Sequence, residues 1–475
     1  MYSLSLQSQG VVRLGKFMRL VKNEYIKLIL KKSTWIMMIL LIIGIIGYPF
    51  LAKFVQWQTG DSDTSYAENI LQDYQNQIDY LKDVKTENWE NETQKLQYKI
   101  DNNVIDGWKD DAAEAMFAVK FNPDGLYSFT ASQTEEYVNK IDDDIKSGNW
   151  KGYFETACEI AGTISDSMGS QSRIEIYKYC LENDIRPDES NWKYNAVTEM
   201  KNAESEMQEL EAAKAAGQGM DESTYQNDKN TKLKCEYRLK NNISYDISEH
   251  NNWMYSGKFD FWSVFCTTTT LLSFIGLIVI VIGGGIVSGE FSGGTIKFLL
   301  INPVKRWKIL ASKYFTTVTF GFILIAVAFI LSAVTTLTIY GGDNISASYI
   351  SVVDGKISEI PGFVYCIKSY LLSSIEIVVM STLAFAISSV ARSSALAIGI
   401  SVMAYFSGST IMLILSQLNL SWGRYLIFAN VDISRILEGS PMFMGQTVSG
   451  AICVIAVHMV IFLLTAWDGF TRREA

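Results

Sequence analysis

The sequence predicts an all-α integral membrane protein with six transmembrane helices, an N-terminal amphipathic elbow helix and a mainly helical extracytoplasmic domain. Six apolar stretches support this, because each can cross about 30 Å of hydrocarbon as a helix. The charge distribution supports it as well, since residues 56–260 carry about −19 although the whole chain carries −9. Basic flanks beside apolar stretches are typical of membrane proteins, so we expect a lipid bilayer and no nucleic acid among the partners.

Lysine and arginine residues occur in alternate segments between the apolar stretches, and the positive-inside rule places these segments in the cytoplasm. We therefore expect a multi-pass protein of a bacterial cell membrane, with cytoplasmic N- and C-termini and residues 56–260 outside the cell. The expected order is a cytoplasmic N-terminus with the elbow helix (1–34), a first span (35–55), the extracytoplasmic domain (56–260), a second span (261–288), a cytoplasmic coupling loop (289–312), a third span (313–340), an outer loop (341–366), a fourth span (367–391), a fifth span (394–416), an outer loop with a re-entrant segment (417–446), a sixth span (447–467) and a cytoplasmic tail (468–475).

The segment before the first span has the pattern of an interfacial helix. At 100° per residue its apolar side chains fall on one arc, and most of its lysine and arginine residues fall outside that arc. The apolar set is Leu14, Phe17, Met18, Val21, Tyr25, Leu28 and Ile29. The alternative is a basic anchor that obeys the positive-inside rule and is amphipathic only by accident.

The long insert between the first two spans predicts a compact helical domain. Residues 61–85 and 191–216 are helix-compatible, and residues 122–125 and 217–219 contain helix breakers. Five tryptophans are candidates for a small core: Trp89, Trp108, Trp150, Trp192 and Trp253. The six cysteines encode no disulfide framework, because the insert holds three (Cys158, Cys180 and Cys235) and the spans or their edges hold the others (Cys266, Cys366 and Cys453).

No pattern of catalytic residues is present, so we expect no enzyme activity from this chain alone and no directly bound cofactor or metal. The sequence lacks a phosphate-binding loop, a Gly-x-Ser-x-Gly elbow and a kinase signature. Its two histidines, His250 and His458, are too far apart in sequence to form a standard zinc motif. The glycines at 283–285 lie within an apolar span, and together with Gly289 and Gly293 they indicate close packing between helices.

The loop between the second and third spans is the most informative segment. After Glu290 the chain has a flexible pair of glycines, a short helical stretch over Thr295–Leu300, a stop at Pro303, and a new helix from Arg306 into the membrane. Phe298, Leu299 and Leu300 are apolar although they lie in a basic cytoplasmic loop. Solvent exposure explains such a triplet poorly, so we expect it to bind in a groove or, alternatively, to lie on the membrane as an interfacial turn.

Glu290-Phe-Ser-Gly-Gly-Thr295, followed by Phe298-Leu-Leu300 and Pro303-Val-Lys-Arg306, resembles the transmembrane permeases of type-2 (type V exporter-like) ABC transporters that have a large insertion after the first helix. Lys305 departs from the small polar residue usual in that family. The resemblance covers about 180 residues near the C-terminus and, more loosely, the elbow helix and first span. It implies a coupling helix that docks on a separate ATP-binding subunit, through Glu290, Gly294, Thr295, Lys297, Phe298, Leu299, Leu300, Pro303 and Arg306.

The same resemblance implies the composition of the complex. Two ATP-binding subunits would carry ATP and Mg, and a second permease copy would complete a homodimer or a pseudo-symmetric heterodimer around a central pathway. It also suggests short re-entrant helices before the sixth span. A peptide or small-molecule cargo is expected, and the acidic insert favours cationic peptides because it would attract them by long-range electrostatics.

Four polar residues within the spans are candidates for the pathway: Glu376, His458, Thr267 and Thr270. Glu376 and His458 lie at similar depths, which indicates a direct contact or a shared polar cavity. The alternative for Glu376 is a protonated carboxyl group that hydrogen-bonds a nearby hydroxyl. The alternative for Thr267 and Thr270 is a purely structural role, because threonine hydroxyls can bond to carbonyls of the preceding turn.

The leading function is therefore that of a permease subunit in an ATP-driven exporter. A sensor or mechanotransmission subunit is the alternative, in which the outer domain binds a ligand or an envelope partner and no cargo crosses the membrane. An intramembrane enzyme is disfavoured, because Glu376 and His458 have no accompanying nucleophile or metal-binding set.

Overall fold

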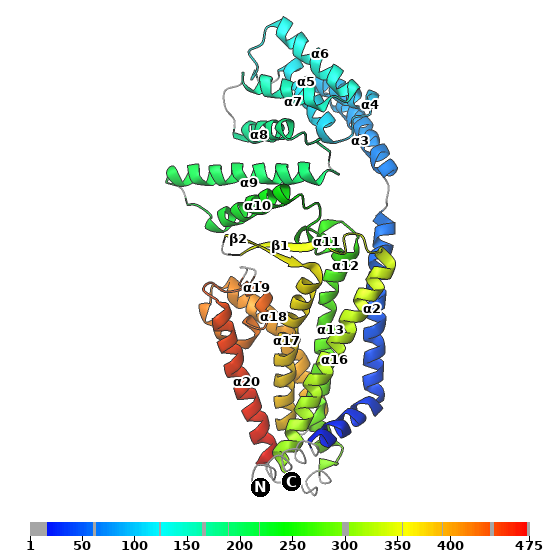
Figure 1. Ribbon diagram of the computed structural model, residues 1–475, viewed down its shortest axis with the longest axis vertical. Coiled ribbons are helices and arrows are strands. Elements are labelled where there is room, and N and C mark those ends of the chain that lie inside the picture. Colours follow the sequence, from blue (N-terminus) through cyan, green and yellow to red (C-terminus); the bar gives the residue numbers. More distant parts are fainter. Residues whose placement is uncertain are drawn as a thin grey trace. The chain divides into compact units, whose positions relative to one another are not determined.

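The chain is an all-α membrane protein with one small hairpin, as the sequence predicts. The structure is a computed structural model (Figure 1), and it describes residues 17–59, 63–122, 125–163, 168–188, 190–217, 219–296, 304–353, 355–391, 393–437 and 441–472. The chain divides into two compact units. Unit 1 comprises residues 1–58, 249–346 and 361–475, and unit 2 comprises residues 59–248 and 347–360.

Among the residues that the structure describes, unit 1 contains six helical segments that are long and apolar enough to cross a membrane. These are α2 (Lys32–Thr59), a second span built from α12 (Phe261–Thr267), η2 (Thr268–Leu271) and α13 (Leu272–Ile286), then α16 (Arg306–Tyr340), α17 (Gly362–Val390), α18 (Ser394–Gln417) and α20 (Val448–Thr471). A further helix covers residues 17–30, and the shorter elements are α11 (Trp253–Ser256), α14 (Ser288–Ser292), η3 (Ser421–Tyr425), η4 (Ile427–Ala429) and α19 (Ile433–Leu437).

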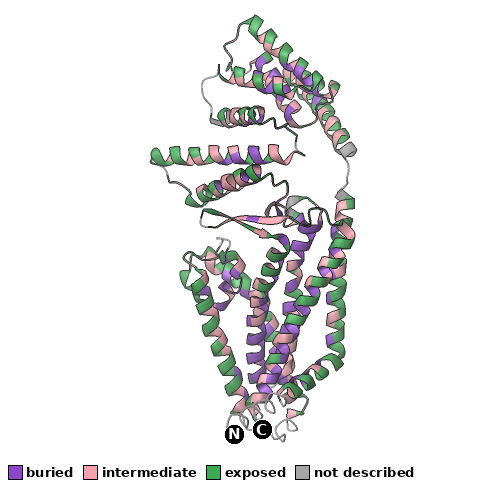
Figure 2. Cartoon of the chain, in the orientation of Figure 1, coloured by how far each residue is buried: buried purple, intermediate pink, exposed green. Residues whose placement is uncertain are grey.

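The helix α13 lies at the centre of unit 1 and packs against α16, α17 and α18. Glycines make these close contacts possible: a Cβ atom at Gly283 would lie 3.2 Å from the Ser381 carbonyl oxygen of α17, and one at Gly284 would lie 3.2 Å from the Ile398 Cα of α18. The expected packing role is thus confirmed for Gly283 and Gly284. It is not seen at Gly289, where a Cβ atom would meet nothing within 4 Å. Figure 2 shows the resulting burial along α13 and α17 and the exposed outer face of α20.

Unit 2 is a series of helices, most of which pack against the next in sequence. They are α3 (Asp63–Val84), α4 (Trp89–Asp101), α5 (Gly107–Phe121), α6 (Ala131–Ser147), α7 (Trp150–Ala161), α8 (Met168–Glu182), α9 (Trp192–Ala215) and α10 (Glu222–Asn241). Aromatic stacking dominates the core, with ring centroids 4.0 Å apart for Phe154 and Tyr177 and 6.0 Å apart for Trp108 and Tyr153. Trp150 packs beside this core, whereas Trp253 lies in unit 1, so the prediction that Trp253 belongs to the same core is wrong.

A β-hairpin that follows α16 in sequence belongs to unit 2. Its strands are β1 (Ser348–Val353) and β2 (Lys356–Pro361), and β1 packs against α10. The Asp246 carboxylate is fully buried, accepts a hydrogen bond from the Ile350 N–H (3.0 Å) and pairs with the Lys234 ammonium (3.1 Å). The sequence predicts an outer loop over this segment and does not predict the hairpin. The sequence of these residues is only a weak indication of strands, because strand formation depends on tertiary contacts. The buried contact of the hairpin here is Asp246, which lies 104 residues away in sequence.

Candidate functional site

Four charged side chains meet at one end of unit 1, and we call Glu24, Lys27, Glu290 and Lys313 the charged cluster. The Lys313 Nζ atom lies 2.8 Å from Glu24 Oε2 and 2.9 Å from Glu290 Oε1. The Lys27 Nζ atom lies 2.9 Å from the same Glu290 oxygen. The Lys313 side chain is only 1% exposed. Two ammonium groups and two carboxylates make the cluster electrically neutral, which reduces the free-energy cost of burying it.

A break in the helix positions Glu290 for this cluster. The helix α13 ends at Ile286, and the chain turns at Val287 before α14 begins. The Ser388 hydroxyl of α17 accepts hydrogen bonds from the N–H groups of Val287 (3.3 Å) and Ser288 (3.0 Å), which the break would otherwise leave unpaired. Glu290 therefore lies directly beyond the end of the second span.

The Glu290 carboxylate is held in its ionised form. Burial alone would raise its pKa, but the nearby Lys313 ammonium and hydrogen bonds from Thr295, Lys27 and Lys313 outweigh burial and lower the pKa of Glu290 to about 2. The Thr295 hydroxyl donates to Glu290 Oε2. Glu290 is thus a fixed negative charge that joins α14 to α16 and to the N-terminal helix.

The helix over residues 17–30 brings Glu24 to the cluster. Val21, Glu24 and Leu28 are its buried residues, and the Tyr25 hydroxyl lies 2.6 Å from Thr319 Oγ1 of α16. Only part of the predicted apolar arc is buried against the rest of unit 1: Val21 and Leu28 are buried, whereas Met18 is 52% exposed. Glu24 is not among the predicted site residues. The sequence does set this residue apart, because Glu24 is the only acidic residue among the first 60.

The predicted coupling residues are placed only in part. Gly294 has a positive φ of 68°, a conformation that glycine adopts without strain. The Thr295 hydroxyl donates a hydrogen bond to the Glu290 carboxylate. Arg306 Nη1 donates to the Thr471 carbonyl oxygen at 3.2 Å, which joins the start of α16 to the end of α20. Lys297, Phe298, Leu299, Leu300 and Pro303 lie outside the described residues. The adjoining Ile296 and Val304 both pack on an apolar cluster of α16, α17 and α20.

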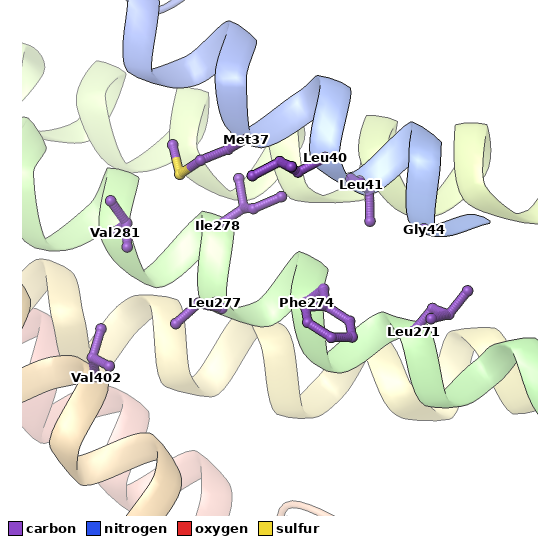
Figure 3. A pocket seen from close by; sticks show the side chains of 10 residues that line it. All are labelled: Met37, Leu40, Leu41, Gly44, Leu271, Phe274, Leu277, Ile278, Val281 and Val402. Carbon is purple, nitrogen blue, oxygen red and sulfur yellow. The ribbon is translucent and has the colours of Figure 1, made fainter. Parts of the chain in front are cut away.

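An apolar groove of about 660 Å³ runs along α2 and α13. Figure 3 shows side chains of α2 on one side, side chains of η2 and α13 on the other, and Val402 of α18 at one end. The lining residues are Met37, Leu40, Leu41, Gly44, Leu271, Phe274, Leu277, Ile278, Val281 and Val402. None of the four predicted pathway residues is among them.

A polar cavity of about 370 Å³ adjoins this groove and shares Met37 and Val281 with it. All four residues of the charged cluster line the cavity, together with residues of α2, α13 and α18. The charged cluster and the apolar groove are therefore two parts of one region. A rearrangement of the cluster would alter the end of the groove.

The two predicted pathway threonines satisfy their hydroxyl groups locally. Thr267 Oγ1 donates to the Ser263 carbonyl oxygen at 2.5 Å, and Thr270 Oγ1 donates to the Thr267 carbonyl oxygen at 2.8 Å. Thr267 is buried, and the chain forms a 3₁₀ turn directly after it. This geometry matches the structural alternative for the threonines.

Glu376 and His458 make no hydrogen bond or ion pair with each other within the described part of the chain. His458 Nδ1 instead lies 2.8 Å from the Val454 carbonyl oxygen of its own helix, and its ring packs against Phe462. Glu376 is half-buried on α17, and Asp432 and Tyr405 are the groups that interact with it electrostatically. The structure thus shows no direct contact between Glu376 and His458, and their shared role in a pathway stays a prediction.

One family and two relatives are similar to this chain. A family model described as "Protein of unknown function (DUF2705)" matches residues 240–475, which include five of the six candidate spans. The uncharacterized protein YhcI of Bacillus subtilis (strain 168) is 31% identical over 296 residues, which cover 62% of this chain and 88% of YhcI. The uncharacterized membrane protein YdbK of the same strain is 30% identical over 208 residues, which cover 44% of this chain and 80% of YdbK.

Proposed function

The chain belongs to the protein family of YhcI and YdbK, and within that family we propose that it serves as the membrane-spanning permease subunit of an ATP-driven ABC exporter. In this proposal ATP and Mg bind to two copies of a separate ATP-binding subunit. A second permease copy, identical or pseudo-symmetric, completes the complex. The chain itself has no catalytic role.

The charged cluster is the observation that supports this proposal most directly. Residues 293–305, where the sequence resembles a coupling segment, follow Glu290 on α14 and precede α16, which carries Lys313. Both residues belong to one ion-pair network, and Glu24 joins the N-terminal helix to it. Force applied to this loop by a cytoplasmic ATPase would therefore reach α13, α16 and the N-terminal helix together.

The cargo that we propose is a cationic peptide or a small drug-like molecule. Support comes from the negative charge of the insert, about −19, which would raise the local concentration of cationic molecules. The apolar groove beside the charged cluster adds a surface that suits the apolar part of an amphipathic peptide. Movement of the cluster would change the shape of that surface during the ATPase cycle.

Copurification from the native membrane tests the class of the protein. We expect an ATP-binding subunit at one copy per permease. A second experiment uses vesicles reconstituted with the complex, in which we expect Phe298→Glu and Leu299→Glu to uncouple ATP hydrolysis from transport. Asn23→Glu is the matched control, because it adds the same charge to an exposed site on the N-terminal helix. Unaltered binding and coupling in both loop variants would contradict the proposal, as would ATP hydrolysis by the isolated chain.

The alternative of a sensor or mechanotransmission subunit is favoured by one observation. The chain passes between unit 1 and unit 2 four times, and the hairpin between α16 and α17 is part of unit 2. Vesicles separate the two functions. ATP-dependent accumulation of a labelled cationic peptide supports export, whereas ATPase stimulation without accumulation supports relay.

A further inference from the structure

Two cysteines that are 100 residues apart in sequence face each other in unit 1. Cys266 lies in the last turn of α12, Cys366 lies in the first turns of α17, and their Sγ atoms are 3.5 Å apart. Their exposed fractions are 8% and 1%. We propose that Cys266 and Cys366 form a disulfide bond that joins the second and fourth spans at their outer ends.

The geometry suits this bond. A disulfide has an S–S length of about 2.05 Å, so the two sulfur atoms must approach by about 1.5 Å, which small side-chain rotations can provide. The other cysteines are placed elsewhere: Cys158, Cys180 and Cys235 are in unit 2, and Cys453 is exposed on α20. The sequence alone gave no reason to pair Cys266 with Cys366, because their proximity arises only from the packing of the helices.

Both cysteines are buried, and aromatic side chains near them in sequence pack against one another. Phe363, three residues before Cys366, packs on Trp262 and Phe265 with ring centroids 5.1 Å and 6.3 Å apart, and Phe265 stacks on Tyr370 at 6.5 Å. A sulfur pair that is covered in this way is shielded from soluble reductants. Once formed in the folded protein, the bond would therefore persist.

A hydrogen-bonded joint lies one turn further along α17. The Tyr370 hydroxyl lies 2.8 Å from Thr268 Oγ1 and 3.2 Å from Ser332 Oγ, so it bridges η2, α16 and α17. The disulfide would add a covalent link beside this joint. The charged cluster lies beyond the other end of the second span and is held by ion pairs and a hydrogen bond from Thr295, without a covalent link, so ATP-driven movement would pivot about the disulfide-linked end.

The oxidation needs a compartment and an oxidant. This step rests on the proposed orientation, which places the beginning of α12 and of α17 outside the cell, where disulfides persist. An extracytoplasmic dithiol–disulfide oxidant supplies the electron acceptor. The thiolate of one cysteine attacks the disulfide of the oxidant, and the thiolate of the other then attacks the mixed disulfide, so that the oxidant leaves as a dithiol with two electrons and two protons.

Burial sets the time at which this exchange takes place. In the folded chain both cysteines are buried, so the first exchange, with the oxidant, must precede the packing of α12 against α17, and the second exchange, between Cys266 and Cys366, is completed as these helices pack. The bond is consequently a permanent cross-link and does not cycle with cellular redox state. Reductant added to the folded protein should leave it intact.

Differential alkylation of the full-length protein tests the proposal. Cells are treated with N-ethylmaleimide before lysis to prevent later oxidation, and the purified chain is denatured in SDS and alkylated with a second, heavier maleimide before and after reduction. We expect Cys266 and Cys366 to take up label only after reduction, and we expect a linked peptide pair that is lighter by two hydrogens. Labelling of both cysteines without reductant would overturn the proposal.

Serine variants provide the controls. In Cys266→Ser, Cys366 should take up label without reductant, whereas Cys453→Ser should leave the protection of the pair unchanged. Both single variants and the double variant should lower the melting temperature by the same amount, because each removes the same bond; shifts that add would also overturn the proposal. None of these measurements requires an ATPase partner, so failure of the proposed export function would not affect them.

Discussion

Lys313 is an almost fully buried lysine at the beginning of a membrane span, and two carboxylates account for it. An isolated buried ammonium group would be strongly unfavourable, but Glu24 and Glu290 lie within hydrogen-bond distance of Nζ. The three groups come from three separate parts of the chain. Each therefore depends on the others for its stability.

Replacing Lys313 by methionine should destabilise the protein by roughly 3 kcal/mol, because two buried carboxylates then lose their main counter-charge. The measurement is the free energy of unfolding, or the melting temperature, in detergent. Lys305→Met is the matched control, since Lys305 is exposed at the start of the same helix and should have little effect. Adding Glu24→Gln to the Lys313 variant should restore part of the loss; a further loss would contradict the ion-pair account.

The lowered pKa of Glu290 predicts a pH dependence. Its pKa is about 2 in the folded chain and its ordinary value is 4.5, so its stabilising contribution is fully present above pH 4.5 and is lost as the pH falls toward 2. The contribution is roughly 2 to 3 kcal/mol. Glu290→Gln should therefore be less stable than the wild-type protein at pH 7, and the two melting temperatures should converge below pH 4.5.

A matched variant isolates this effect from the general acid sensitivity of the chain. Glu206→Gln removes an exposed carboxylate from α9 and should melt in parallel with the wild-type protein over the whole range. If the difference between Glu290→Gln and the wild-type protein stayed constant from pH 7 to pH 3, Glu290 would not be held ionised by the charged cluster.

At the scale of the elements, a glycine in α18 allows η4, in the segment before the last span, to pack closely against this helix. A Cβ atom at Gly408 would lie 2.2 Å from the Phe428 ring of η4, whereas one at Gly399 of the same helix would meet nothing within 4 Å. Gly408→Ala should cost about 1 to 3 kcal/mol through overpacking, and Gly399→Ala should be neutral or slightly stabilising. Thermal unfolding of both variants checks this.

The Phe428→Ala background tests the cause. With the ring removed, Gly408→Ala should cost much less, since the added methyl group then occupies vacant space. An unchanged cost in that background would show that the substitution acts elsewhere than on the contact between α18 and η4.

Local sequence patterns predict the membrane-spanning helices, because these depend on the hydrophobicity of a continuous stretch of chain. A continuous apolar stretch suffices to identify a span, so all six were predicted. The helix start at Arg306, which the stop at Pro303 predicts, is confirmed, whereas the predicted span begins only at residue 313, because the first turns of α16 carry lysine and arginine residues that a hydropathy criterion excludes. The buried partners of Lys313 come from elsewhere in the chain, so hydropathy could not indicate that it lies inside the structure.

Contacts between distant segments were the part that sequence patterns did not predict. Glu24 reaches Lys313 across 289 residues, and Asp246 reaches the hairpin across 104. The pairing of Glu376 with His458 was inferred from equal depth alone. Depth fixes position along the membrane normal but leaves the rotation of each helix undetermined, and the structure directs the His458 imidazole to the Val454 carbonyl oxygen.

At the scale of the whole molecule, orientation in the membrane can be tested with two engineered cysteines. Met444 is 95% exposed in the segment before α20, and Lys305 is exposed at the start of α16. In a background in which Cys158 and Cys453 are replaced by serine, Met444→Cys should react with a membrane-impermeant maleimide on intact cells, and Lys305→Cys should react only after permeabilisation. The opposite result would place the loop before α16 outside the cell and would end the exporter proposal.

The hairpin in unit 2 has a practical consequence for anyone who wishes to study the acidic domain in isolation. A recombinant fragment of residues 59–248 would lack β1 and β2, and Asp246 would lose the amide of Ile350 that holds its buried oxygen. A better fragment would splice residues 347–360 onto the end of 59–248 through a short linker. For the same reason, a single protease nick in the insert should not shed the domain from cells, since four separate stretches of polypeptide still tether it.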